Sequence, residues 1–201
     1  MTTRALMVAA MLLSVNLTTA AAQAPSLPQL PPSLEVPAGN ELYLAASAEG
    51  TQNYVCLPDG AGAKWRFVGP QATLFQQVKG GPPQQITTHF LSTNPTEAPT
   101  ARPTWQHSVD SSRVWAQVLG HPVTDPNYVE AGAIPWLLLQ AAGTENGRGG
   151  GKALSTTTFI QRVNTSGGTA AASDCSVVGH IGKVALVPYT TDYFFYRAIR
   201  P

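Results

Sequence analysis

Charged side chains are scarce in this chain. Only 11% of its 201 residues are Asp, Glu, Lys or Arg, against a usual share of about 25%. Twelve basic residues nearly balance eleven acidic ones, and the sequence contains no basic stripe or acidic block. Because nucleic acids are bound largely through basic residues that neutralise phosphates, we expect no nucleic-acid partner. Surface polarity must come from Ser, Thr, Asn and Gln, which suits a neutral, hydroxyl-rich ligand.

Long apolar runs are also missing. The N-terminal run, residues 5–15, has roughly 11 residues, whereas a membrane-spanning helix needs about 20. It follows Arg4 and precedes the small residues of the stretch 20–24, which is the layout of a secretory signal peptide. We therefore predict a leader over residues 1–22, no transmembrane segment after its cleavage, and a secreted protein that is extracellular or periplasmic.

Only two cysteines occur, Cys56 and Cys175. In an oxidising compartment this number favours one disulfide, with two buried free thiols as the alternative. Such a bond would close a loop of roughly 120 residues, for which the chain-entropy model gives about 4–5 kcal/mol. Structural zinc requires four nitrogen or sulfur ligands at short spacings, so we predict no metal here and no cofactor.

The chain has no long amphipathic helical pattern and no internal repeat. Instead, short runs alternate in polarity, are rich in β-branched and aromatic residues, and are separated by Gly and Pro. They cover residues 64–68, 86–91, 114–119, 156–163, 183–187 and 192–197. The pattern predicts an all-β single domain, a β-sandwich or barrel, with at most one or two short helices near 92–98 or 124–132.

Two segments depart from this alternation. Residues 23–38 are Pro-rich and predict an extended segment that precedes a single β domain over residues 39–201. Residues 134–142 are almost continuously apolar. This run fits either a strand buried on both faces or a short core helix, and its periodicity does not distinguish them.

Several motifs along the chain follow one order. They are Tyr54-Val55-Cys56, Trp65 to Pro70, Thr88-His89-Phe90, Pro103-Thr104-Trp105 with Asp110, Ile134 to Leu139, Gln161 to Gly168, Cys175, and Val187 to Thr190 followed by Asp192 to Tyr196. This order resembles the secreted bacterial and fungal family called domain of unknown function 3455, over nearly all of the chain after the leader. The resemblance implies a single extracytoplasmic domain and no established activity. The segment Leu91 to Arg102, which separates His89 from Trp105, is longer than the family pattern implies.

Some members of that family carry a malate dehydrogenase label, which these residues do not support. A dinucleotide site needs Gly-x-Gly-x-x-Gly between a strand and a helix. The nearest stretch, residues 147–152, ends in Lys152 where the last glycine is required, and no helical pattern follows. The same stretch lacks the Ser or Thr that a phosphate-binding loop places after its lysine. We expect a flexible surface loop and not a dehydrogenase.

One polar cluster suggests chemistry. His107 lies three residues before Asp110, and His89 precedes Trp105 in the same region. His89, His107 and Asp110 could serve a secreted hydrolase or metal-dependent enzyme as ligands, or as a base and its orienting acid. Alternatively, His89 lies on the outer face of a strand while His107 and Asp110 shape a hairpin turn. Two histidines and one aspartate without regular spacing are a weak metal pattern.

The tryptophans suggest binding. Trp65 and Trp136 have the context of core residues, whereas Trp105 and Trp115 flank a predicted hairpin. If both of the latter point to solvent, they form a stacking platform for sugar rings. Alternatively, Trp115 belongs to the core. Arg162 is expected only to form a structural ion pair with Asp174 or Asp192.

These observations favour a binding module over an enzyme. The sequence contains no Gly-x-Ser-x-Gly nucleophile motif. We expect a non-catalytic envelope or polysaccharide-binding module whose ligand site includes Trp105, Trp115, His89, His107 and Asp110. Its partner would be a cell-wall or extracellular polysaccharide.

Overall fold

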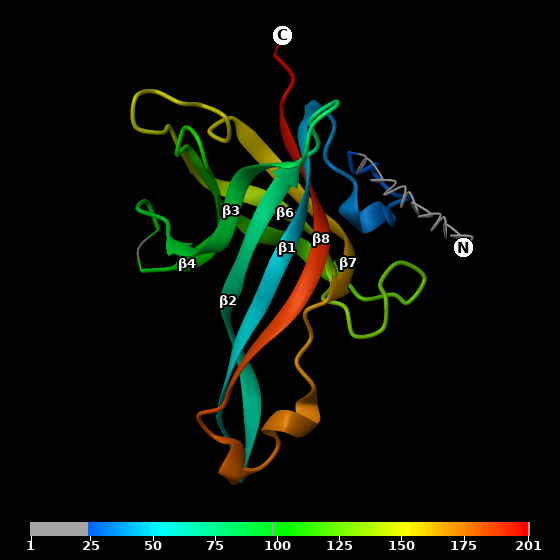
Figure 1. The fold of residues 1–201 in the computed structure, drawn as a ribbon, viewed down its shortest axis with the longest axis vertical. Helices are drawn as coiled ribbons and strands as arrows, with labels where there is room; N and C mark the ends of the chain where they lie inside the picture. The colour runs from blue at the N-terminus through cyan, green and yellow to red at the C-terminus, as the bar shows by residue number, and fades with distance from the viewer. Residues whose placement is uncertain (1–23, 98, 201) are drawn as a thin grey trace, which may run out of the picture.

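The computed structural model describes residues 24–97 and 99–200. Eight antiparallel strands form a closed barrel in which each strand pairs with the next along the chain and the last pairs with the first (Figure 1). The strands are β1 (Asn40–Asp59), β2 (Gly62–Gln76), β3 (Gln84–Thr93), β4 (Ala101–His107), β5 (Arg113–Val123), β6 (Trp136–Glu145), β7 (Thr157–Gly167) and β8 (Val184–Ala198). The all-β prediction is confirmed, and of its two architectures the barrel is correct and the sandwich is not.

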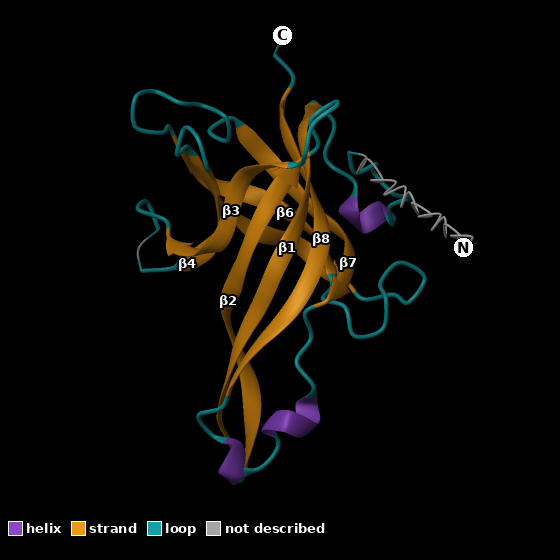
Figure 2. Cartoon of the chain, in the orientation of Figure 1, coloured by secondary structure: helices purple, strands orange, loops and turns teal. Residues whose placement is uncertain are grey.

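Helical structure in the described residues is limited to three short 3₁₀ turns, η1 (Pro32–Leu34), η2 (Ala172–Cys175) and η3 (Val178–His180) (Figure 2). None of them lies at 92–98 or 124–132, where short helices were considered. At the second of these places the Asp125 carboxylate accepts a hydrogen bond from the Asn127 amide, which favours a turn. No helix in the described part of the chain has the length and apolar character needed to cross a membrane.

Side chains alternate between the inside and the outside of the barrel, and both sides are packed. Ile160, Tyr193 and Phe195 belong to the inner core. Their neighbours Phe159 and Phe194 belong to a second core on the outer surface. Because successive residues of a strand point to opposite faces, both faces are buried where β7 and β8 carry consecutive apolar or aromatic residues, at 159–160 and 193–196.

The same two-sided burial explains the continuous apolar run after Pro135. Within β6, Leu137 and Leu139 lie in the inner core, whereas Trp136 and Leu138 lie in the outer one. This segment is therefore a strand buried on both faces, and the helix alternative is wrong.

The Pro-rich N-terminal segment covers the outer core. Leu34 in η1 is fully buried there. The Gln161 side-chain amide donates a hydrogen bond to the Leu34 carbonyl at 2.7 Å, and the Tyr196 hydroxyl lies 2.7 Å from the Gln161 side-chain oxygen. The segment is thus part of the folded domain. The predicted leader, residues 1–22, lies outside the described residues.

A narrow extension projects from one end of the barrel (Figure 1), built from the β1–β2 hairpin and the start of β8, with η2 and η3 at its tip. The predicted disulfide between Cys56 and Cys175 is present and joins β1 to η2. Trp65, expected in the core, is instead half-buried in this extension, where its indole N–H donates to the Ala171 carbonyl at 2.9 Å.

We expect Leu34→Ala to lower the free energy of unfolding by about 2–4 kcal/mol, because the substitution leaves a cavity between η1 and the barrel. Leu27→Ala is the matched control, since Leu27 belongs to the same segment but is 43% exposed. Urea unfolding followed by circular dichroism measures both. Equal effects of the two substitutions would show that the segment does not stabilise the barrel.

Candidate functional site

His89 and Trp105 face each other inside the barrel. They are cross-strand partners of β3 and β4, and their rings stack with centroids 4.1 Å apart. Tyr193 of β8 meets both rings edge-on, at 5.5 and 5.4 Å. The hairpin therefore brings together two residues that the intervening segment Leu91 to Arg102 separates in the sequence.

His89 is a neutral residue here. Its Nδ1 lies 2.9 Å from the Thr104 carbonyl oxygen, which only accepts hydrogen bonds, so Nδ1 carries the proton. Burial lowers the pKa of His89 to about 3, with a smaller contribution in the same direction from the charge of Arg162, although the hydrogen bond to Thr104 opposes both. The remaining ring nitrogen, Nε2, is consequently an acceptor at neutral pH. The alternative that placed His89 on an outer strand face is wrong.

A cavity of about 280 Å³ lies beside this aromatic group. All eight strands contribute to its lining, and it occupies the end of the barrel that bears the extension. Tyr54 and Phe67 lie in edge-to-face contact at 5.6 Å on the extension side, and Leu137 and Leu139 provide apolar wall. Eight-stranded barrels have interiors of a size that either fills with side chains or holds one small ligand.

Three polar side chains that line the cavity have unmet hydrogen-bonding capacity. The Gln52 side-chain nitrogen, the Trp105 indole nitrogen and the Tyr193 hydroxyl are buried and make no hydrogen bond of good geometry with the described residues, although the Tyr189 hydroxyl lies near Gln52 and Tyr193. Burial raises the pKa of Tyr193, and the nearby Arg162 and Tyr189 only partly oppose this, so the hydroxyl keeps its proton. An unsatisfied buried polar group costs about 1–3 kcal/mol, so three beside one cavity call for a functional explanation.

Arg162 is the charged residue of the cavity. Its position in β7, opposite Leu137 and Tyr193, directs it to the inside of the barrel. Nη2 and Nε donate to the Pro135 carbonyl at 2.8 and 3.2 Å. The predicted ion pair with Asp174 or Asp192 is absent from the described structure. Asp192 instead accepts hydrogen bonds from Ser47 and Asn164.

Gln52, Tyr193 and Arg162 are site residues that the sequence pattern did not predict. One signal was available: Ile160 and Arg162 are two residues apart in a predicted strand, so they share a face, and Ile160 marks that face as apolar. A charged residue on the inner face of a strand calls for a polar partner inside the protein. Gln52 and Tyr193 offered no comparable signal.

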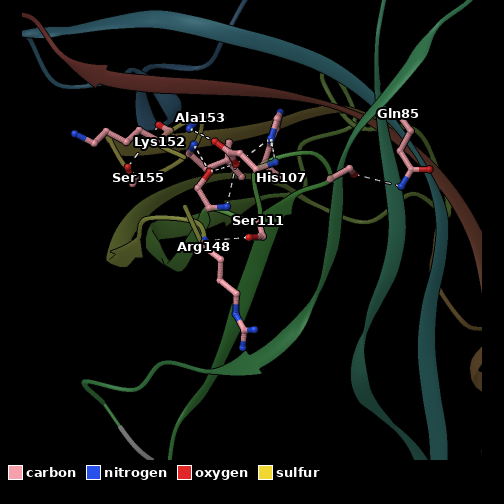
Figure 3. A network of polar contacts seen from close by, with 11 residues as sticks. Gln85, His107, Ser111, Arg148, Lys152, Ala153 and Ser155 are labelled. Carbon is pink, nitrogen blue, oxygen red and sulfur yellow. Dashed lines mark hydrogen bonds and ion pairs between the residues drawn. The ribbon is translucent and has the colours of Figure 1, made fainter. Parts of the chain in front are cut away.

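His107 and Asp110 lie at the other end of the barrel from the cavity. Figure 3 shows His107 within a network of polar contacts. The His107 ring nitrogen Nδ1 is 3.0 Å from Asp110 Oδ1. Oδ1 also accepts hydrogen bonds from the Ser112 amide and hydroxyl at 2.9 and 2.7 Å, and Oδ2 accepts one from the Ala153 amide at 2.9 Å. This network holds the β6–β7 loop so that Leu154 is fully buried in the inner core.

The glycine-rich stretch 147–152 is a largely exposed part of this loop, and its first residue is anchored against the barrel. Gly147 is buried, and a Cβ at that position would collide with the Asp110 carbonyl oxygen. The Gly147 amide donates to the Gly151 carbonyl at 2.8 Å, which closes the loop. The glycines therefore have a structural role, which agrees with the absence of a nucleotide-binding motif.

His89, His107 and Asp110 do not meet at one point. His107 pairs with Thr87, two residues from His89 along β3. Within the described residues, no group of three His, Cys, Asp or Glu side chains is arranged to hold a metal ion. His107 and Asp110 instead shape the turn between β4 and β5, as the alternative predicts.

Trp105 and Trp115 do not form an exposed platform. Trp105 points into the barrel and is 1% exposed, whereas Trp115 lies on the opposite face and is 2% exposed. The Trp115 indole N–H donates to the Ser92 hydroxyl at 2.9 Å. The expectation of a solvent-facing pair is wrong. Trp115 pairs with Thr104, the neighbour of Trp105, and therefore lies on the other face of the sheet from Trp105.

We expect Asp110→Asn to lower the free energy of unfolding by about 1–3 kcal/mol at pH 7, because an amide nitrogen cannot accept the Ala153 hydrogen bond. Burial alone would raise the pKa of Asp110, but the hydrogen bonds from Ser112 and Ala153 and the charge of His107 lower it to about 2, below the ordinary 3.8. The stabilisation is therefore complete above about pH 4 and is lost as the pH falls toward 2.

Urea unfolding at pH 7, 4 and 2.5 tests this pH dependence, with Asp59→Asn as the control. Asp59 forms an exposed ion pair with Arg66, which contributes about 0–1 kcal/mol. The difference between wild type and Asp110→Asn should shrink as the pH falls. A difference that is the same at all three pH values would refute the role of the ionised carboxylate.

The family assignment is consistent with the sequence resemblance. The family model described as "Protein of unknown function (DUF3455)" matches residues 37–197, which include the whole barrel except the last residue of β8. No curated protein and no solved structure matches the chain. With this match over most of its length, the chain belongs to the DUF3455 family of proteins of unknown function.

Proposed function

We propose that this protein is an extracytoplasmic, non-catalytic binding protein that holds a small molecule in the cavity of its barrel. One observation carries the proposal: Gln52, Trp105 and Tyr193 line the cavity, are buried, and make no side-chain hydrogen bond of good geometry with the described residues. Ligand sites typically combine an apolar wall with a few polar groups of this kind. Buried polar groups without hydrogen-bond partners destabilise the fold unless a ligand or water supplies the missing hydrogen bonds.

The size of the cavity limits its ligand to a small molecule. A volume of about 280 Å³ is just below the range of ligand pockets, which span roughly 300–1,000 Å³. A polysaccharide chain would instead need an open surface. The surface expected for it, exposed Trp105 and Trp115, is not available because both are buried. The proposal therefore keeps the binding module and replaces the polymer with a small ligand.

The alternative of a hydrolase or metal-dependent enzyme gains no support from its three residues. With its pKa lowered to about 3, His89 is a poor general base. Both carboxylate oxygens of Asp110 are engaged by hydrogen bonds that hold a loop. Chemistry at Asp110 would thus compete with the packing of the loop that it holds.

Two features support a location outside the cytoplasm. The N-terminal sequence has the layout of a secretory leader. The disulfide between Cys56 and Cys175 is of a kind that persists mainly in oxidising compartments.

Filling the cavity tests the proposed function. Val118 lines the cavity but is 42% exposed, so Val118→Trp places an indole at its mouth without disturbing the core. Val109→Trp is the matched control, because Val109 is 85% exposed and lies in the turn beside Asp110, at the other end. The probes are a library of aromatic and aliphatic fragments, observed by saturation-transfer NMR.

We expect a subset of fragments to bind the wild type and Val109→Trp and to lose binding to Val118→Trp by tenfold or more. Thermal unfolding of all three proteins verifies that they are folded. The proposed function is wrong if no fragment binds the wild type, or if the fragments that bind do so equally well after the cavity is filled.

A further inference from the structure

Arg162 differs from the other arginines of the described structure. Four arginines pair with carboxylates at 2.8–3.7 Å: Arg66, Arg102, Arg113 and Arg197. Two more, Arg148 and Arg200, are exposed to water. Arg162 is partly buried inside the barrel, and the hydrogen bonds that it makes with described residues go to one backbone carbonyl.

The positive charge of Arg162 dominates the cavity. None of the side chains that line the cavity is acidic. The charge of Arg162 lowers the pKa values of His89, Tyr54 and Tyr193, although burial is the larger influence on all three. His89 therefore stays neutral and adds no second positive charge. A partly buried charge without a counterion is costly, so the site favours a negatively charged ligand.

We propose that the ligand of this cavity is a small carboxylate whose anionic group binds the Arg162 guanidinium. This inference rests on the proposed function and adds the chemical class of the ligand. The Arg162 guanidinium lies near the Tyr193 hydroxyl, but its hydrogen bonds of good geometry run from Nε and Nη2 to Pro135, which leaves Nη1 able to donate to a ligand. A carboxylate matches the planar donor fork of a guanidinium, and such charge-assisted hydrogen bonds are strong.

A singly charged ligand fits the site better than a phosphate. The cavity supplies one formal positive charge and no lysine, which balances one negative charge and not two. The apolar side chains Phe67, Leu137 and Leu139 would contact the body of the ligand. Neutral Nε2 of His89 would accept a hydrogen bond from a hydroxyl or N–H group of that body.

Matched acids and amides test the inference, because the members of each pair share size and shape and differ in charge. The probes are benzoate and benzamide, hexanoate and hexanamide, and indole-3-acetate and indole-3-acetamide. Dissociation constants are measured at pH 7 by ligand-observed NMR for the wild type, Arg162→Gln and Arg113→Gln. Arg113 is the control, because its partners Gln106 and Glu145 lie outside the cavity.

We expect the acid of at least one pair to bind the wild type and Arg113→Gln at least tenfold more tightly than its amide. In Arg162→Gln this preference should fall to about one, while the amide still binds. Phenyl phosphate should bind no more tightly than benzoate. The inference is overturned if amides bind as well as acids, if the preference survives in Arg162→Gln, or if phenyl phosphate is the tightest ligand.

A second variant covers the structural role of Arg162, whose hydrogen bonds hold Pro135. If Arg162→Gln does not fold, Arg162→Lys replaces it, since lysine keeps the charge and loses the planar fork. The preference for acids should then fall below that of the wild type and remain above one. An unchanged preference overturns the inference. If fragments bind the wild type, are blocked by Val118→Trp and show no preference for acids, the proposed function holds. Only the inference that the ligand is a carboxylate is then overturned.

Discussion

Closure of the sheet by the pairing of β8 with β1 is the constraint on which the other features depend. A closed barrel gives every strand residue either an inner or an outer position and leaves no sheet edge within the barrel itself. The inner volume must then be filled by side chains or hold a small ligand. Leu154 and the aromatic group around Trp105 fill one end and the middle, and the cavity around Arg162 remains at the other end.

The charged residues at the two ends of the barrel differ in how completely they are hydrogen-bonded. At the filled end, Asp110 is surrounded by hydrogen-bond donors that compensate its burial and lower its pKa. At the cavity end, the hydrogen bonds of good geometry from Arg162 go only to the Pro135 carbonyl, and the Gln52 side-chain nitrogen and the Tyr193 hydroxyl make none with the described residues. A carboxylate whose interactions are complete has a structural role, whereas donors with remaining capacity beside an empty volume are the physical signature of a binding site. This contrast is the reason for placing function at the cavity end.

Much of the fold could be predicted from local patterns. Period-2 alternation identified strands such as 114–119 and 192–197, and the cysteine count identified the disulfide. The site was less accessible to prediction. His89 and Trp105 were recognised, but their stacking arises from the register of β3 and β4, which the sequence between them does not reveal. The position of Trp115 beside a predicted hairpin suggests binding, yet Trp115 is buried on the outer face.

The sequence by itself determined the fold class, the disulfide partners and the low content of charged residues. These properties follow from composition and from spacing along a few residues, which local backbone geometry converts directly into strands and turns. Tertiary structure alone decided between sandwich and barrel, buried both faces of β6, and placed Arg162 beside Tyr193 without a carboxylate. Those outcomes depend on which strands pair and in which register, and pairing is set by the packing of the whole chain, because residues that are distant in sequence must share one closed interior.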